Sequence, residues 1–277
     1  MVKYKDVSIT AFIVNESRAR LESLSGDIYA KLWVTEEAKH LWEELAQEVY
    51  PYDHINLSLR NRFYLDRTKG FVTEHADSVF VNMAAGFTSY PHLFDTPCRC
   101  IETDYPHIMN FKEKKVREWQ QEGALPERSI EFYPLDMENH DELNSFEESF
   151  ASWCEGTPAI IIMEGLTYYL STGTLDNLFS CYAKYLVKGS LVVFDFWGPD
   201  SDSYPAIQRL KKYLSRISGG PVKDLTYMDM DHIRNIKQFS VVEHTDIAEL
   251  ERRYTETLVL QEKANRFPTE FVVLNKN

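Results

Sequence analysis

The sequence predicts an α/β protein built on a doubly wound, mostly parallel sheet of seven strands. Strand-like apolar segments alternate with amphipathic helical segments from Ser78 onward. Some of these segments are continuous apolar runs, such as residues 159–163 (A-I-I-I-M), which is typical of strands buried on both faces. Small or acidic residues follow the first five strands, at the edge where open α/β sheets bind their ligands.

The residues before Ser78 are expected to be helical. Thr35 is a predicted helix N-cap, followed by Glu36 and Glu37, whose carboxylates suit the positive end of a helix dipole. Apolar residues then recur at helical spacing as far as Val49, and a further helix is expected over residues 57–74. We therefore expect one domain over residues 1–277, with a helical cap or lid in residues 1–76 and the sheet in residues 77–277. Residues 197–221 are a second candidate lid.

Seven segments are expected to be strands: residues 79–83, 99–103, 130–133, 159–163, 191–196, 239–243 and 270–274. Apolar helical faces are expected between the second and third strands and between the fourth and fifth. The last two strands have no strong helical pattern between Leu260 and Phe267, so they are expected to pair antiparallel at the edge of the sheet.

Composition excludes several classes of partner. The chain carries a net charge of −13, which repels nucleic acid backbones. No apolar run reaches the ~20 residues that a membrane span needs, and the N-terminus has no signal-peptide core. The four cysteines form no C-x-x-C pair, so no metal site is expected, and we predict reduced thiols in a cytoplasmic protein.

A turn of small residues, Ala84-Ala85-Gly86, follows the first strand, and Asp104 ends the second strand about 20 residues later. Such a turn lets a ligand approach backbone N–H groups, and an acid at this spacing is the usual partner of ribose hydroxyls. The pair predicts a nucleoside cofactor. Because alanine stands at the first position, its φ angle is expected to be negative.

Other polar residues near the strand ends need partners. Glu164 closes the apolar strand of residues 159–163, and a buried carboxylate there requires a cation or N–H groups. Lys112 falls within the apolar face formed by Ile108 and Phe111, so we expect it to form an internal ion pair with Glu102 or another strand-end carboxylate.

Four segments in this order resemble one family. Residues 61–67 (N-R-F-Y-L-D-R) are similar to its N-R-x-Y-x-x-R, and residues 81–88 (V-N-M-A-A-G-F-T) to its V-N-L-G-A-G-x-D. Residues 102–106 (E-T-D-Y-P) with Lys112 are similar to its E-x-D-x-P-x(5)-K, and residues 162–170 to the stretch containing E-G-x-x-x-Y-L. The chain thus resembles the leucine carboxyl methyltransferase-like O-methyltransferases, which use S-adenosylmethionine and include bacterial polyketide O-methyltransferases. The resemblance implies a class I, Rossmann-like methyltransferase fold.

The resemblance also implies which residues hold the methionine end of the cofactor. Arg62 would bind its carboxylate, for which a guanidinium fork is suited, with Lys31 as a second candidate. Glu164 would lie near its amino group. Ala84 and Gly86 would let this end approach the backbone.

The nucleoside end is assigned in the same way. Asp104 would accept from both ribose hydroxyls, while Asp136 and Met137 would flank the adenine. No catalytic residue is identified, since His54, His92, His107 and His140 are all expected to be surface or loop residues. Tyr168 and Tyr169 are candidates to line the acceptor pocket.

The predicted function is therefore S-adenosylmethionine-dependent O-methylation of a carboxyl or hydroxyl group on a small molecule. A protein C-terminal carboxyl methyltransferase is an alternative. So is a binding module that has lost catalysis, because Ala84 and Thr88 depart from the family pattern. A nicotinamide dehydrogenase ranks last, because G-x-G-x-x-G is absent.

Overall fold

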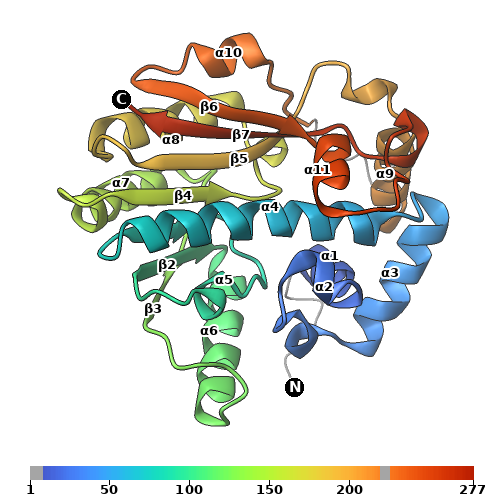
Figure 1. The fold of residues 1–277 in the computed structure, drawn as a ribbon, viewed down its shortest axis with the longest axis horizontal. Coiled ribbons are helices and arrows are strands. Elements are labelled where there is room, and N and C mark those ends of the chain that lie inside the picture. The colour runs from blue at the N-terminus through green and yellow to red at the C-terminus, as the bar shows by residue number, and fades with distance from the viewer. Residues whose placement is uncertain (1–8, 219–224) are drawn as a thin grey trace.

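The computed structural model describes residues 9–218 and 225–277, and within them seven strands form one sheet in the order β3-β2-β1-β4-β5-β7-β6 (Figure 1). The strands are β1 (Val79–Asn82), β2 (Arg99–Asp104), β3 (Ile130–Pro134), β4 (Ala159–Met163), β5 (Leu191–Trp197), β6 (Phe239–Asp246) and β7 (Thr269–Lys276). The first five are parallel, whereas β7 runs antiparallel to both β5 and β6. The predicted doubly wound sheet is confirmed. The antiparallel pair β6–β7 is at the edge of the sheet as expected. The strand that runs opposite to the others is β7, and it lies one position in from the edge strand β6.

Helices precede the sheet and alternate with its strands. Before β1 come α1 (Ile9–Arg20), α2 (Glu22–Ser25), α3 (Glu36–Glu48) and α4 (Asp53–Glu74). After it come α5 (Tyr90–Leu93), α6 (Pro106–Gln121), α7 (His140–Cys154), α8 (Thr172–Tyr185), α9 (Pro205–Ser218), α10 (Met230–Arg234) and α11 (Ile247–Tyr254). Thr35 is the N-cap of α3, as predicted, and its hydroxyl accepts from the N–H of Ala38. The helix predicted over residues 57–74 is α4, which begins one turn earlier, at Asp53.

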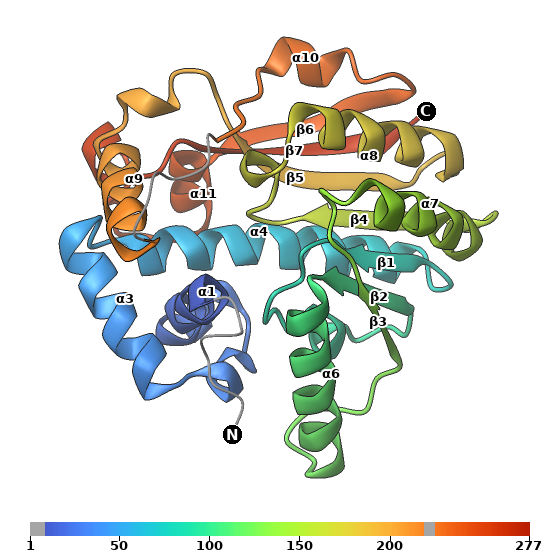
Figure 2. The same ribbon diagram turned by 180° about the vertical axis from the view of Figure 1, so that it is seen from behind.

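The two faces of the sheet pack against different helices, because successive side chains of a strand point to opposite sides. Phe80 and Ile160 face α4, which crosses in front of the sheet in Figure 1. Val81 and Ile161 face α7 and α8, which lie in front in the reverse view of Figure 2. Both faces are therefore buried, which accounts for the continuous apolar runs of β1 and β4.

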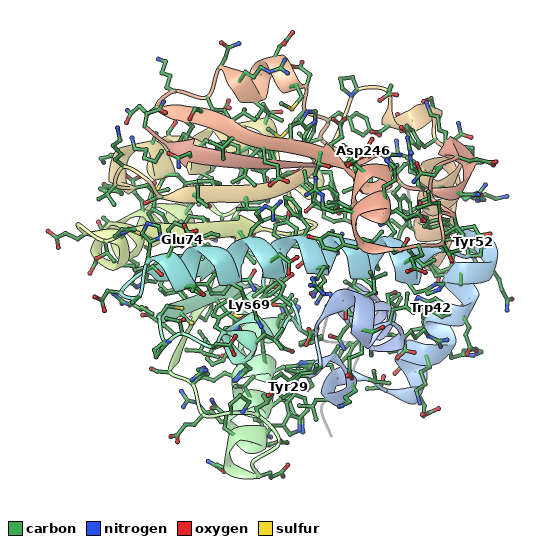
Figure 3. All side chains as sticks on the ribbon, in the orientation of Figure 1. Tyr29, Trp42, Tyr52, Lys69, Glu74 and Asp246 are labelled. Carbon is green, nitrogen blue, oxygen red and sulfur yellow. The ribbon has the colours of Figure 1, made fainter. Side chains whose placement is uncertain are left out.

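Helix α4 lies between the N-terminal helices and the sheet. Its 22 residues extend from beside Tyr52 to Glu74 (Figure 3), about 33 Å. Arg67 forms a double hydrogen bond with Glu243 of β6 at 2.5 Å, and α1 packs on the side of α4 away from β6. Among the described helices, none is both long enough and apolar enough to cross a bilayer.

Candidate functional site

A buried charge cluster surrounds Glu164, directly after β4. One carboxylate oxygen accepts hydrogen bonds from Arg18 of α1 at 2.9 Å and Arg60 of α4 at 3.1 Å. The other accepts from the hydroxyl of Tyr90 at 2.6 Å. Burial alone would raise the pKa of Glu164, but the two guanidinium groups hold it below its ordinary value. The lone acid predicted to need a cation therefore has two.

The backbone after β4 is shaped to admit Arg60. Gly165 has φ +65°, and a Cβ placed there would lie 2.9 Å from the Arg60 Nη1 atom. The N–H of Gly165 donates to Asp195 of β5 at 2.6 Å, and the Tyr64 hydroxyl donates to the same carboxylate oxygen at 2.5 Å. Asp195 Oδ2 is buried and has no hydrogen-bond partner among the described residues. Burial raises the pKa of Asp195, against the opposing effect of Arg60.

The small-residue turn after β1 brings Gly86 onto Asp104. Gly86 has φ +45°, and its N–H donates to Asp104 at 2.8 Å, while the N–H of Tyr105 donates to the other carboxylate oxygen at 2.7 Å. Burial raises the pKa of Asp104, and these two N–H groups oppose the rise. The turn and the second-strand acid thus meet, as their spacing predicts.

Ala84 does not have the negative φ expected of it; its φ is +53°. The neighbouring hydrogen bonds impose this conformation. Met83 N–H donates to Ile162, and Ala85 N–H donates to Thr103, so the chain is held on both sides of Ala84. Thr88 closes the turn by donating to the Ala85 carbonyl and accepting from Asn82. Tertiary pairing therefore overrides the preference of alanine for negative φ.

The loop after β3 lies next to Asp104. Leu135 N–H donates to the Asp104 carbonyl at 2.8 Å, which fixes the start of this loop. Asp136 follows; its side chain accepts from the Glu138 N–H, and Met137 is buried. The structure therefore brings Gly86, Asp104, Asp136, Met137 and Glu164 to the carboxyl edge of the parallel strands.

Two residues of the predicted set lie elsewhere. Lys31 is two-thirds exposed and pairs with Glu22 at 3.4 Å. Arg62 pairs with Asp66 on its own helix at 2.8 Å. Positions two apart on a helix point in nearly opposite directions, so Arg60 faces the strand ends and Arg62 cannot.

Sequence reasoning missed Arg18, Arg60 and Tyr90. Helical phase is the signal that could have found Arg60, because it shares a face with Leu57 and Tyr64 at spacings of three and four residues. No comparable signal points to Arg18, which sits in a segment of weak periodicity. The expected ion pair of Lys112 with Glu102 is confirmed at 2.7 Å, with both side chains almost fully buried.

A cavity of about 110 Å³ adjoins the charge cluster. Arg60 links the two, because it bonds Glu164 through Nε and the Tyr168 hydroxyl through Nη1 at 3.3 Å. Tyr168 and Tyr169 both line this cavity, Tyr168 buried and Tyr169 half exposed. The walls also include Leu210 and Leu214 of α9, within the second candidate lid, whose residues 219–221 lie outside the described part.

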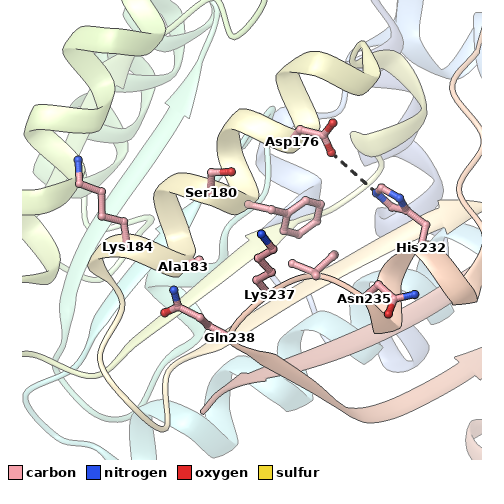
Figure 4. Close-up of a pocket in the computed structure, with 10 residues that line it drawn as sticks. Asp176, Ser180, Ala183, Lys184, His232, Asn235, Lys237 and Gln238 are labelled. Carbon is pink, nitrogen blue, oxygen red and sulfur yellow. Dashed lines mark ion pairs between the residues drawn. The ribbon is translucent and has the colours of Figure 1, made fainter.

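A larger hollow of about 650 Å³ lies between α8 and α10 (Figure 4). His232 and Asp176 face one another across it at 3.8 Å, and Lys184 and Gln238 lie at its other end, near the amino end of β5. None of its described lining residues belongs to the charge cluster or stands at the carboxyl end of β1, β2 or β4. Open α/β sheets bind ligands at that carboxyl edge, so the Glu164 cluster is the better candidate site.

Comparisons with known proteins identify the family and the fold of the chain. The family model of leucine carboxyl methyltransferases matches residues 7–183. A candidate methyltransferase from Thermobifida fusca superposes with a TM-score of 0.63 at 15% identity, covering 96% of this chain and 94% of that one. A DUF574 family protein from Streptomyces avermitilis gives 0.62 at 11% identity, covering 97% of both chains. The Synechocystis magnesium protoporphyrin IX methyltransferase with bound S-adenosylhomocysteine gives 0.50 at 11%, covering 87% and 95%.

No curated protein sequence matches the chain. The structural likenesses show a methyltransferase fold, and the family model spans more than half of the sequence. The chain therefore belongs to the leucine carboxyl methyltransferase family, whose members use S-adenosylmethionine.

Proposed function

We propose that this protein transfers the methyl group of S-adenosylmethionine to an oxygen atom of a small molecule, at a carboxyl or hydroxyl group. The observation that carries the proposal is the pairing of Glu164 with Arg18 and Arg60. The methionine end of the cofactor carries a carboxylate and an ammonium group side by side. A buried acid next to two guanidinium groups is complementary to both.

The other residues also fit the cofactor. Asp104 is a buried carboxylate beside the Gly86 turn, where it can accept from a ribose diol. Among the described residues, a Cβ built on Gly86 would meet only Ala11, at 3.7 Å, so this backbone is open to close approach. Asp27 is a further buried acid, which interacts electrostatically with Arg18 and Glu164. Burial raises the pKa of Asp27, Asp104 and Asp195, and a positively charged ligand would favour their ionised forms.

We assign the cofactor contacts accordingly. Arg60 and Arg18 would hold the carboxylate of the methionine end, and Glu164 its ammonium group. Asp104 would hold the ribose, and Asp136 with Met137 would flank the adenine. When bound, the cofactor supplies a methyl group on a positively charged sulfur, and the protein has to orient the acceptor and exclude water.

A small acceptor is favoured by the cavity beside Arg60. At about 110 Å³ it is of the same order as the 150 Å³ cavity that holds a benzene molecule, so the acceptor group inside it is limited to the size of one ring or a short chain. Residues of α1, α3, α4 and α9 form part of its walls, which supports a role for residues 1–76 as a cap on a core of residues 77–277. The four cysteines are free, which fits a cytoplasmic location.

Titration calorimetry with S-adenosylmethionine, S-adenosylhomocysteine and NAD tests the cofactor. We expect the first two to bind and NAD not to bind. Arg60→Ala and Asp104→Asn should each weaken binding at least tenfold, since each removes a charged hydrogen-bond partner. Arg62→Ala is the matched control on the same helix and should leave affinity unchanged. Absence of binding by both adenosyl compounds would overturn the proposal and favour a binding module that has lost catalysis.

A further inference from the structure

The cavity beside Arg60 has a buried carboxylate in its wall that cofactor binding does not use. Asp53 is the first residue of α4, is only 4% exposed, and accepts from the Ser17 hydroxyl at 3.2 Å. Among the described residues that line the cavity, Asp53 is the only acid. Arg60 lines the same cavity, but its guanidinium group is already bonded to Glu164 and Tyr168.

One face of α4 supplies the polar wall of the cavity. Asp53, Asn56, Leu57 and Arg60 follow each other at the spacing of one helical face, and all four line it. Asn56 is almost fully buried, and its Oδ1 atom has no hydrogen-bond partner among the described residues. The wall therefore presents an unpaired amide oxygen and a carboxylate, both of which accept hydrogen bonds.

Flat aromatic surfaces make up much of the remaining wall. The rings of Tyr168 and Trp197 are stacked with centroids 4.0 Å apart and planes 10° apart. Phe267 continues the stack on Trp197 at 6.0 Å and 15°. Aliphatic side chains such as Ile13 and Leu57 also line the cavity. Flat aromatic walls of this kind favour a planar ring as the occupant.

We propose that Asp53 is the proton acceptor for a hydroxyl group on a single-ring, phenol-like methyl acceptor, and that this pocket selects neutral hydroxyl compounds over carboxylates. This inference rests on the proposed methyltransferase function and narrows it. A carboxylate acceptor placed beside Asp53 would bring two anions together in a buried site, whereas a hydroxyl donates a hydrogen bond to it.

The electrostatics of Asp53 suit this role. Burial raises its pKa from 3.8 to about 6, against the opposing effects of Arg60 and the Ser17 hydroxyl. Among the described residues, Tyr50 in the loop before α4 also interacts with Asp53, whose charge raises the pKa of the phenol. A carboxylate with a raised pKa is ionised at neutral pH and is a stronger base than an ordinary aspartate.

The transfer balances without a further reactant. The acceptor oxygen forms a bond to the methyl carbon, the carbon–sulfur bond breaks, and its electron pair stays on sulfur. The hydroxyl proton passes to the Asp53 carboxylate. Subsequent loss of this proton to water restores the ionised acid.

The first test measures binding and needs no turnover. Phenol and benzoate share one ring and differ in the group offered to Asp53, so their affinities are compared by calorimetry with S-adenosylhomocysteine present. We expect the native protein to prefer phenol. Asp53→Asn should weaken phenol binding at least tenfold and strengthen benzoate binding, because the repelling charge is gone. A merely damaged pocket would weaken both.

The second test follows methyl transfer to phenol and to the more acidic 4-nitrophenol. Asp53→Asn should lower kcat for phenol about 100-fold or more, the usual contribution of a general base. It should affect 4-nitrophenol much less and move the rise of the pH profile to higher pH, since the acceptor must then ionise by itself. Asp66→Asn, also on α4 but paired with Arg62 outside the cavity, is the control and should behave as the native protein.

The outcomes separate the two proposals. Absence of binding by both S-adenosylmethionine and S-adenosylhomocysteine removes the proposed function and this inference with it. If these ligands bind, three results overturn the inference alone: no phenol binding, preference for benzoate, or equal losses for phenol and 4-nitrophenol in Asp53→Asn.

Discussion

Replacing Asp53 with asparagine should stabilise the protein at neutral pH and have a much smaller effect in acid. The pKa of this carboxyl is 3.8 in an unfolded chain and about 6 in the folded protein, because burial disfavours its ionised form. The folded state therefore holds the proton more tightly. The resulting stability is present below pH 3.8 and is lost as the pH rises through 6.

The size of the effect follows from the shift. A difference of roughly two pKa units corresponds to about 3 kcal/mol of unfolding free energy, at about 1.4 kcal/mol per unit. Asparagine resembles the protonated carboxyl and does not ionise. The stability of Asp53→Asn relative to the native protein should therefore increase by about 3 kcal/mol between pH 3 and pH 8.

Urea unfolding at a series of pH values measures this quantity directly. The native protein and Asp53→Asn are compared, with Asp66→Asn as a control for neutralising a carboxylate on α4. Parallel stability curves for the native protein and Asp53→Asn across this range would refute the reasoning, because they would show that Asp53 ionises equally easily in both states. An acid that costs stability when ionised is what a site built for proton transfer requires.

Four further outcomes are expected. Lys112→Met should lower the unfolding free energy by about 3–5 kcal/mol in denaturant unfolding, because Glu102 is left buried without its cation. The double variant Lys112→Met with Glu102→Gln should recover most of that loss. Additive losses from the two substitutions would contradict this. Gly165→Ala should weaken S-adenosylmethionine binding in calorimetry by displacing Arg60. Gly156 has a similar positive φ but open space around it, so Gly156→Ala should not weaken binding. Equal effects of the two substitutions would show that the contact of residue 165 with Arg60 is unimportant. Ala84→Gly should raise the unfolding free energy by up to about 1 kcal/mol, because glycine adopts positive φ without strain. Ala85→Gly should lower the unfolding free energy. A lower unfolding free energy for both variants would argue against strain at Ala84. S-adenosylmethionine affinity should fall as the pH is lowered from about 8 to about 5, because the raised pKa values of Asp104 and Asp195 make these acids lose their charge first. The affinity of S-adenosylhomocysteine, which lacks the sulfonium charge, should fall less. Equal pH dependence of the two affinities would exclude this charge effect.

Local patterns predicted the strands well because burial on both faces leaves a clear mark. The run of β4 is apolar at every position, and its structure buries every side chain. The Ala84–Gly86 turn and Asp104 were also found from sequence, since their separation along the chain is set by one strand–helix–strand unit. Side chains carried directly by these strand ends were therefore predictable.

Contacts that depend on helix orientation were not predictable in the same way. Arg60 and Arg62 carry the same side chain and are two residues apart, and only the rotation of α4 on the sheet decides which one reaches Glu164. Arg18 is 146 residues from Glu164 in sequence, so its contact depends on how α1 docks. The φ of Ala84 likewise follows from hydrogen bonds to two other strands rather than from its own preference.

The attachment of α4 also limits how the site can open. Arg60, Tyr64 and Arg67 connect three successive turns of this helix to Glu164 after β4, Asp195 of β5 and Glu243 of β6. Swinging α4 outward would break all three connections together, two of them buried. Entry to the cavity must then come from its other walls. Arg18 connects α1 to the same Glu164. A ligand carboxylate that paired with Arg18 would weaken this ion pair, and the new pair between Arg18 and the ligand would replace it. A ligand at Glu164 would therefore change how α1 is held, while the contacts of α4 with the strands would remain.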